Sequence, residues 1–126
     1  MAGKKTIVVK IGTSSLTEKS GRLSPERLRA LTAQVADLRD EGHQVVMVTS
    51  AAIAAGYTLL GYHKRPVAVA AKQACAAVGQ GLLMEEYTRA LQERGYVAAQ
   101  LLLTRDDFRD RRRYHCLLYT SDAADE

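Results

Sequence analysis

Thr6 to Ile11 reads TIVVKI, and the residues Gly12-Thr13-Ser14-Ser15 follow it directly. The β-branched run predicts a buried strand, and the glycine and hydroxyl residues predict a loop at its carboxyl end. Gln44 to Thr49 (QVVMVT) predicts a second buried strand, and Ser50 and an alanine-rich helix start, Ala51 to Ala55, come directly after it. Two strands that end in polar residues indicate an α/β protein, in which ligands bind outside the carboxyl ends of the strands.

The segment between these strands predicts a helix. Ser24 is suited to the N-cap and Pro25 to the first helical position. Apolar residues then recur at helical spacing, at Leu28, Leu31, Val35 and Leu38. Gly42 stands where such a helix ends.

Three further segments follow the second strand. Val67 to Val78 is apolar nearly all round, which predicts a helix that is buried or lies in a subunit interface. Gly79-Gln80-Gly81 is expected to interrupt it before a second, amphipathic helix, Leu82 to Arg94, and Tyr96 to Leu103 predicts a third strand. Alternating strands and helices favour a three-layer α/β sandwich, with a mostly parallel sheet covered on both faces. Because such sheets usually have more than three strands, we expect part of a larger domain.

Composition excludes several classes of protein. The chain has 126 residues, of which 47% are hydrophobic and 25% charged, as in an ordinary globular unit. No apolar stretch reaches the ~18 residues that a membrane helix needs. Cys75 and Cys116 fit neither a metal spacing nor a disulfide framework, so we expect no metal site of this kind and a reduced, cytoplasmic protein. Arg105 to Arg113 holds five arginines offset by three aspartates, which favours a solvated surface over a nucleic-acid site.

The last eleven residues are expected not to be native. Cys116 to Glu126 reads CLLYTSDAADE, which is one reading frame of the transposase adapter used in sequencing libraries. A segment of that origin would have no part in the native fold. Without Asp122, Asp125 and Glu126 the net charge of +4 becomes +7.

Two polar clusters are candidates for chemistry. Lys10 lies near the end of the first strand, ahead of Gly12, Thr13 and Ser14, and an ammonium beside a glycine loop is suited to phosphate. A solvated turn is the alternative, because turns favour these residues in any case. Ser50 fits a helix N-cap, or an N-cap that leaves the next N–H groups for an anion.

Four stretches together carry a resemblance to a known family. They are Val8–Leu16 (VVKIGTSSL), Val48–Gly56 (VTSAAIAAG), Lys72–Gly81 (KQACAAVGQG) and Gln100–Arg105 (QLLLTR). In this order they resemble the N-terminal part of the glutamate 5-kinases, a branch of the amino-acid kinase family. The resemblance covers Thr6 to Tyr114, so residues 1–115 are interpreted as the N-terminal part of a truncated kinase domain.

The resemblance implies the amino-acid kinase fold and a reaction. The implied reaction is ATP-dependent phosphorylation of the side-chain carboxylate of L-glutamate to L-glutamyl 5-phosphate, the first step of proline biosynthesis, with Mg²⁺ assisting. By the same resemblance, Lys10 contacts the nucleotide phosphates and stabilises the transferring phosphoryl group. Gly12, Thr13 and Ser14 match the loop around those phosphates, and Ser50 matches the glutamate-binding serine.

One residue departs from the family pattern, and much of the family's site lies elsewhere. The family usually has glycine where this chain has Ala51, which adjoins the substrate-binding Ser50. If that residue must adopt a positive φ, its Cβ costs about 1 kcal/mol or more, and we expect a modest loss of glutamate affinity. In the family most ATP contacts, and an aspartate and an asparagine that bind glutamate, lie beyond Tyr114. We therefore expect these 126 residues alone to be inactive.

The resemblance leaves several alternatives open. Another amino-acid kinase, a non-catalytic basic binding module and a regulatory subunit remain competing interpretations. In its complete form the protein is expected to be a homo-oligomer, without membrane or nucleic-acid partners for this segment. Feedback inhibition by proline, a fused reductase and an RNA-binding-like C-terminal domain are open questions at this stage.

Overall fold

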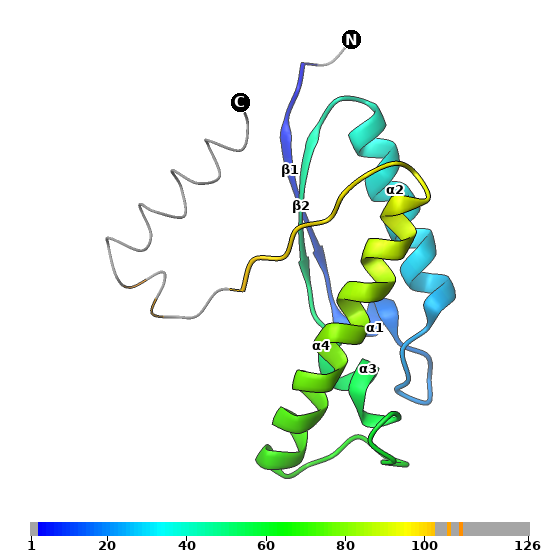
Figure 1. Cartoon of the computed structure of the whole chain (residues 1–126), viewed down its shortest axis with the longest axis vertical. Helices are drawn as coiled ribbons and strands as arrows, with labels where there is room; N and C mark the ends of the chain where they lie inside the picture. Colours follow the sequence, from blue (N-terminus) through cyan, green and yellow to red (C-terminus); the bar gives the residue numbers. More distant parts are fainter. Residues whose placement is uncertain (1–2, 103–105, 107–108, 110–126) are drawn as a thin grey trace.

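The computed structural model describes residues 3–102, 106 and 109, and it is an α/β structure (Figure 1). In chain order its elements are β1 (Thr6–Ile11), α1 (Thr13–Leu16), α2 (Pro25–Asp40), β2 (Gln44–Thr49), α3 (Ala52–Tyr57) and α4 (Val69–Gln92). The segment 105–113, apart from residues 106 and 109, and the whole of 116–126 lie outside the described residues, so the predictions made for them stay untested.

The two predicted strands are confirmed in position and pair in parallel, but the expectation that they are buried is wrong, because each exposes one face in the described structure. The register runs from Thr6 opposite Gln44 to Ile11 opposite Thr49. Parallel neighbours need a long crossover connection, and α2 supplies it here. The Ser50 N–H continues the pairing with a 3.2 Å hydrogen bond to the Ile11 carbonyl. The two chain segments therefore stay together beyond the ends of their strands.

Both long helices lie on the same face of the strand pair (Figure 1). Along β1 the residues alternate, with Ile11 buried on the helix side and Val8 63% exposed on the other side. On β2, Val46 and Val48 are 50% and 49% exposed. The helices of the described residues therefore cover one face of the strand pair, and the parallel strands and helices agree with the α/β fold expected of part of a larger domain. We call the open side the outer face.

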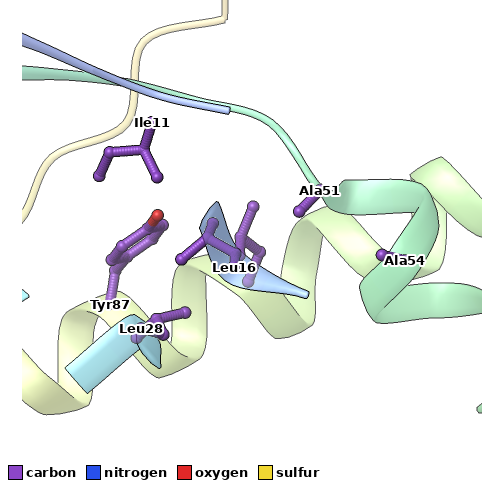
Figure 2. Close-up of a cluster of buried hydrophobic side chains, with 7 residues drawn as sticks. Ile11, Leu16, Leu28, Ala51, Ala54 and Tyr87 are labelled. Atoms are coloured by element: carbon purple, nitrogen blue, oxygen red, sulfur yellow. The ribbon is translucent and has the colours of Figure 1, made fainter. Parts of the chain in front are cut away.

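The local signals for α2 are confirmed. The Ser24 hydroxyl accepts a 3.3 Å hydrogen bond from the Arg27 N–H, and Pro25 is the first helical residue. Gly42 follows the helix with a φ of 94°. The helix packs into a core of buried side chains, shown in Figure 2: Ile11, Leu16, Leu28, Ala51, Ala54, Leu83 and Tyr87. Each large apolar side chain in it contributes roughly 1.5–3 kcal/mol by leaving water.

Helix α4 is continuous, so the predicted interruption at Gly79–Gly81 is wrong. The reason is the contact between α3 and α4, which brings their backbones together at Gly79 and Gly56. A Cβ on Gly79 would lie only 1.6 Å from the Ala52 carbonyl oxygen. Gly79 is therefore a residue of close helix packing, and that packing outweighs its propensity cost of about 1 kcal/mol.

Two other expectations concern the second half. From 67 to 78 only Cys75 is buried, and Val67 and Val69 at the start of α4 are exposed, so this segment is not buried within the chain and its place in a subunit interface stays a prediction. The expected third strand is wrong for the described residues. Residues 96–102 form no strand in the described structure, and Leu103 lies outside it. A strand needs a partner for its backbone hydrogen bonds, and the described residues supply none at this segment.

Candidate functional site

The two polar clusters predicted from the sequence meet at the carboxyl ends of β1 and β2. Because Ile11 and Thr49 are paired in the parallel register, the residues that follow them leave the sheet side by side. The hydroxyl oxygens of Thr13 and Ser50 lie 2.9 Å apart. The Ser50 hydroxyl also donates to the Ile11 carbonyl at 3.3 Å. We call this junction of Thr13 and Ser50 the hydroxyl junction.

The direction of the bonds at the hydroxyl junction follows from proton counting. A serine hydroxyl has one proton, and that of Ser50 points to the Ile11 carbonyl. The Thr13 hydroxyl is then the donor to Ser50. To bind a carboxylate, Ser50 has to turn its proton from the Ile11 carbonyl to the ligand.

The segment after β1 is a helical turn where the sequence predicted a loop. Gly12 is extended, with φ −77° and ψ 161°, and Thr13–Leu16 form the single turn α1. The Arg27 guanidinium from α2 holds this turn, with Nη1 donating at 2.5 Å to the Thr17 carbonyl and at 3.5 Å to that of Ser14. A Cβ on Gly12 would meet nothing within 4 Å, so protein packing leaves open space beside it.

Lys10 lies on the outer face near the end of β1. Its side chain is exposed and alternates with that of the buried Ile11. Its partner in the register is Val48, whose side chain is also exposed. An ammonium here is hydrated and fully available to an anionic ligand that approaches from the open side.

Ala51 has an unusual backbone for an alanine. Its φ is 83° and its ψ is 13°, and among the described residues it is the only non-glycine with a positive φ. This meets the condition set out above, under which the Cβ costs about 1 kcal/mol or more. Ala51 is 5% exposed and packs in the core beside α3 (Figure 2). The strain is thus partly offset by burial of the methyl group.

Sequence reasoning missed Tyr87, which lies behind this site. The Tyr87 hydroxyl on α4 is 2.7 Å from the Thr49 hydroxyl. Burial raises the pKa of Tyr87 above its ordinary value of 10.0, although the bond to Thr49 opposes the rise. The sequence carried only a weak signal for this contact. A tyrosine on an apolar helix face indicates core packing, and only the need of a buried hydroxyl for a hydrogen-bond partner points to a contact with a polar residue.

The described residues show neither a metal-ligand cluster nor a membrane-spanning helix. They contain no group of three or more His, Cys, Asp and Glu side chains that could hold a metal ion. In the same part of the chain, no helix combines the length and the apolar composition that crossing a bilayer requires.

The parallel strand pair, with polar residues gathered at its carboxyl ends, defines an α/β protein, a class in which ligands bind outside the carboxyl ends of the strands. The chain belongs to the amino acid kinase family, whose model matches residues 5–123.

Similar proteins include several named glutamate 5-kinases. The one from Streptococcus suis is 57% identical over 111 residues, which are 88% of this chain and 31% of the relative. That from Neisseria meningitidis serogroup B is 56% identical over 110 residues, which are 87% of this chain and 30% of the relative. That from Shouchella clausii is 57% identical over 109 residues, which are 86% of this chain and 29% of the relative. The chain therefore spans just under a third of the length of these relatives.

Proposed function

We propose that the complete protein carrying this chain transfers a phosphoryl group from ATP to the side-chain carboxylate of L-glutamate. The product is L-glutamyl 5-phosphate, the first intermediate of proline biosynthesis. Family membership and identities of 56–57% to glutamate 5-kinases support the proposal. The structural observation that carries it is the hydroxyl junction, which joins the proposed phosphate loop to the proposed glutamate serine at 2.9 Å.

We assign the roles of the residues as follows. Lys10 contacts the phosphates of ATP and stabilises the transferring phosphoryl group, for which its exposed position at the end of β1 is suitable. Gly12, Thr13 and Ser14 surround the phosphates, and the open space beside Gly12 leaves room for them. Ser50 binds glutamate, and Ala51 adjoins the substrate through its backbone.

The proposed reaction does not need a base to activate its nucleophile. A side-chain carboxylate is already ionised at neutral pH. Catalysis then depends on placing the carboxylate in line with the γ-phosphate and on neutralising the charge that gathers there. Lys10 supplies positive charge to that centre. We propose that Mg²⁺ accompanies ATP, but the described residues offer no ligand cluster for it, so no step is assigned to it.

The test is an acceptor panel with the purified complete protein. Acyl phosphates react with hydroxylamine, so hydroxamate formation in the presence of ATP reports the product directly. L-Glutamate should be the preferred acceptor over L-aspartate, N-acetyl-L-glutamate and uridylate. Preference for another acceptor would replace the proposal by a different amino-acid kinase activity, and no turnover with any acceptor would overturn it.

A matched pair of lysine variants tests the role of Lys10. Lys10→Met should lower kcat/KM by about 10²–10³, as removal of a donor to transition-state charge does elsewhere. Lys19→Met, at another exposed lysine, should leave the activity unchanged. Equal activity of Lys10→Met and wild type would remove Lys10 from the mechanism.

Two further proposals concern partners. We propose that the complete protein is a homo-oligomer, and light scattering checks this. We also propose proline as a feedback inhibitor. Adding proline to the hydroxamate assay checks that point, and unchanged rates at millimolar proline would contradict it.

A further inference from the structure

Tyr87 is buried but bonded to a residue at the edge of the site. It stands in the core cluster, 3% exposed, with its ring among Ile11, Leu16 and Leu28 (Figure 2). Its hydroxyl reaches Thr49, the last residue of β2, at 2.7 Å. A buried phenol hydroxyl without a partner is costly, and this bond joins the end of β2 to α4.

The bond belongs to a directed chain of hydroxyl groups. The Thr49 hydroxyl donates at 3.3 Å to the carbonyl oxygen of Ser50. Because that donation uses the one proton of Thr49, the Tyr87 hydroxyl must be the donor to Thr49. The chain therefore runs from Tyr87 through Thr49 to the carbonyl group of the peptide that joins Ser50 and Ala51.

The Ser50–Ala51 peptide group is the one whose orientation has to be held in place. The C=O and N–H of a trans peptide point in opposite directions, so holding the Ser50 carbonyl turns the Ala51 N–H away from the hydroxyl chain. The Ala51 backbone is left-handed, a strained state that persists only where its surroundings enforce it. The Ser50 side chain and N–H are fixed separately, by the Ile11 carbonyl.

We propose that Tyr87 is a positioning residue, whose hydroxyl acts through Thr49 to hold the Ser50–Ala51 peptide in the orientation that glutamate binding requires. This inference rests on the proposed function. The proposal distinguishes Tyr87 from an ordinary core residue, because loss of the Tyr87 hydroxyl must act through Thr49 and must change the KM for glutamate alone.

Steady-state kinetics of the complete protein test this with three variants and a control. Tyr87→Phe and Thr49→Val should each raise the KM for glutamate about three- to tenfold, the effect of losing one hydrogen bond. The kcat and the KM for ATP should change less than about twofold. The double variant should be no worse than either single one, because both remove the same chain. Thr32→Val removes a different buried hydroxyl, bonded to the Leu28 carbonyl at 2.6 Å, and should leave the KM unchanged.

Several results would overturn the inference. They are an unchanged glutamate KM in Tyr87→Phe, additive effects in the double variant, or an equal rise in Thr32→Val. The last result would mean that any loss of a buried hydroxyl disturbs the site.

A second measurement separates this inference from the proposed function. Carbonyl-¹³C serine with ¹⁵N alanine marks only the Ser50–Ala51 peptide within this chain. Without ligand, its NMR signal should shift in Tyr87→Phe and Thr49→Val but not in Thr32→Val. If the wild type does not phosphorylate glutamate, the proposed function fails, and with it the role in glutamate binding. An unmoved signal would overturn the positioning step even in an active kinase.

Discussion

Ala51 is a residue at which two physical effects of similar size oppose each other. A left-handed backbone costs a residue with a Cβ roughly 1–2 kcal/mol. Burial of its methyl group returns about 0.8 kcal/mol, and an alanine loses less conformational freedom on folding than a glycine does. The methyl group lies in the same core as Leu16 and Leu28, so the alanine is tolerated although the family usually has glycine there.

We expect Ala51→Gly to change the free energy of unfolding by less than about 1 kcal/mol, because relief of strain and loss of burial nearly cancel. The matched control is Ala54→Gly, which removes another buried methyl group from the interior of α3. That variant should be destabilised by about 1–2 kcal/mol, since no strain is relieved. Urea unfolding of both variants checks this, and equal losses would contradict the strain at Ala51.

Under the proposed function, Ala51→Gly should also lower the KM for glutamate modestly, by about two- to fivefold for a gain of up to 1 kcal/mol. The reason is that glycine lets the backbone beside Ser50 adapt to the substrate without strain. Kinetics of the complete protein provide the measurement, and an unchanged KM would count against it.

At the scale of the elements, close approach of backbones decides how α3 and α4 pack. A Cβ on Gly56 would lie 2.0 Å from the Cys75 carbonyl oxygen, and one on Gly79 would clash with Ala52. These atoms belong to backbone and cannot move aside independently of their helices. Gly56 and Gly79 thus let α3 pack closely on α4, directly behind the end of β2.

The pair Gly79 and Gly81 separates packing from helix propensity. Gly79→Ala should destabilise the fold by about 3 kcal/mol or more, because the helices must separate. Gly81→Ala lies in the same helix with nothing within 4 Å of its Cβ, and should stabilise it by up to about 1 kcal/mol. Thermal unfolding gives both values, and a stabilised Gly79→Ala variant would contradict the close contact.

Exposed ion pairs and a hydrogen bond join the end of α2 to the residues that follow α4. Arg94 bonds to Asp37 at 2.9 Å and to Asp40 at 2.5 Å, and the Tyr96 hydroxyl also donates to Asp40. The Tyr96 hydrogen bond, and then Arg94, hold the pKa of Asp40 below its ordinary 3.8. A carboxyl with a lowered folded-state pKa stabilises the fold above its unfolded pKa, and this is lost as the pH falls through the folded-state pKa.

We expect Asp40→Asn to lower Tm at pH 7 and to have little effect at a pH below the lowered folded-state pKa of Asp40, where the wild-type side chain is also uncharged. High salt should reduce the difference at pH 7, since these groups are exposed. Thermal scans at the two pH values test the point. A difference in Tm that is independent of pH would show that the charge of Asp40 does not matter.

At the scale of the whole molecule, the outer face of the strand pair leaves apolar side chains uncovered in this chain. Val8, Val46 and Val48 expose an apolar surface on one side of the strand pair, next to Lys10. The chain also spans only 29–31% of the relatives compared above. Both observations support the proposal that residues 1–115 are the first part of a larger kinase domain.

The 126-residue chain by itself should not convert ATP and glutamate to product. Its exposed valines should also make it aggregate, which light scattering would detect. The complete protein is the positive control in the same hydroxamate assay. Turnover by the purified 126-residue chain would contradict the assignment of essential contacts to the remainder of the domain.

Resequencing the source DNA across codons 110–130 tests the proposal that residues 116–126 are not native. We expect the reading frame to continue past Tyr114 into further kinase sequence, without the adapter codons. Recovery of the codons for Cys116–Glu126 followed by a natural stop would contradict it.

The sequence by itself determined the elements that rest on local chemistry. The β-branched runs of β1 and β2 and the Ser24-Pro25 start of α2 stand where local patterns predict them, because propensity and capping act within a few residues. Parallel pairing of adjacent strands then made the meeting of Thr13 and Ser50 predictable in outline.

Only the tertiary structure decided the features that depend on contacts distant in sequence. Helix α4 runs through Gly79 because α3 packs there, and residues 96–102 form no strand because the described residues supply no partner for their backbone. The positive φ of Ala51 and the bond from Tyr87 to Thr49 likewise arise where α3 and α4 meet the end of β2. The physical reason is that packing and hydrogen bonding between residues distant in sequence outweigh local preferences of about 1 kcal/mol.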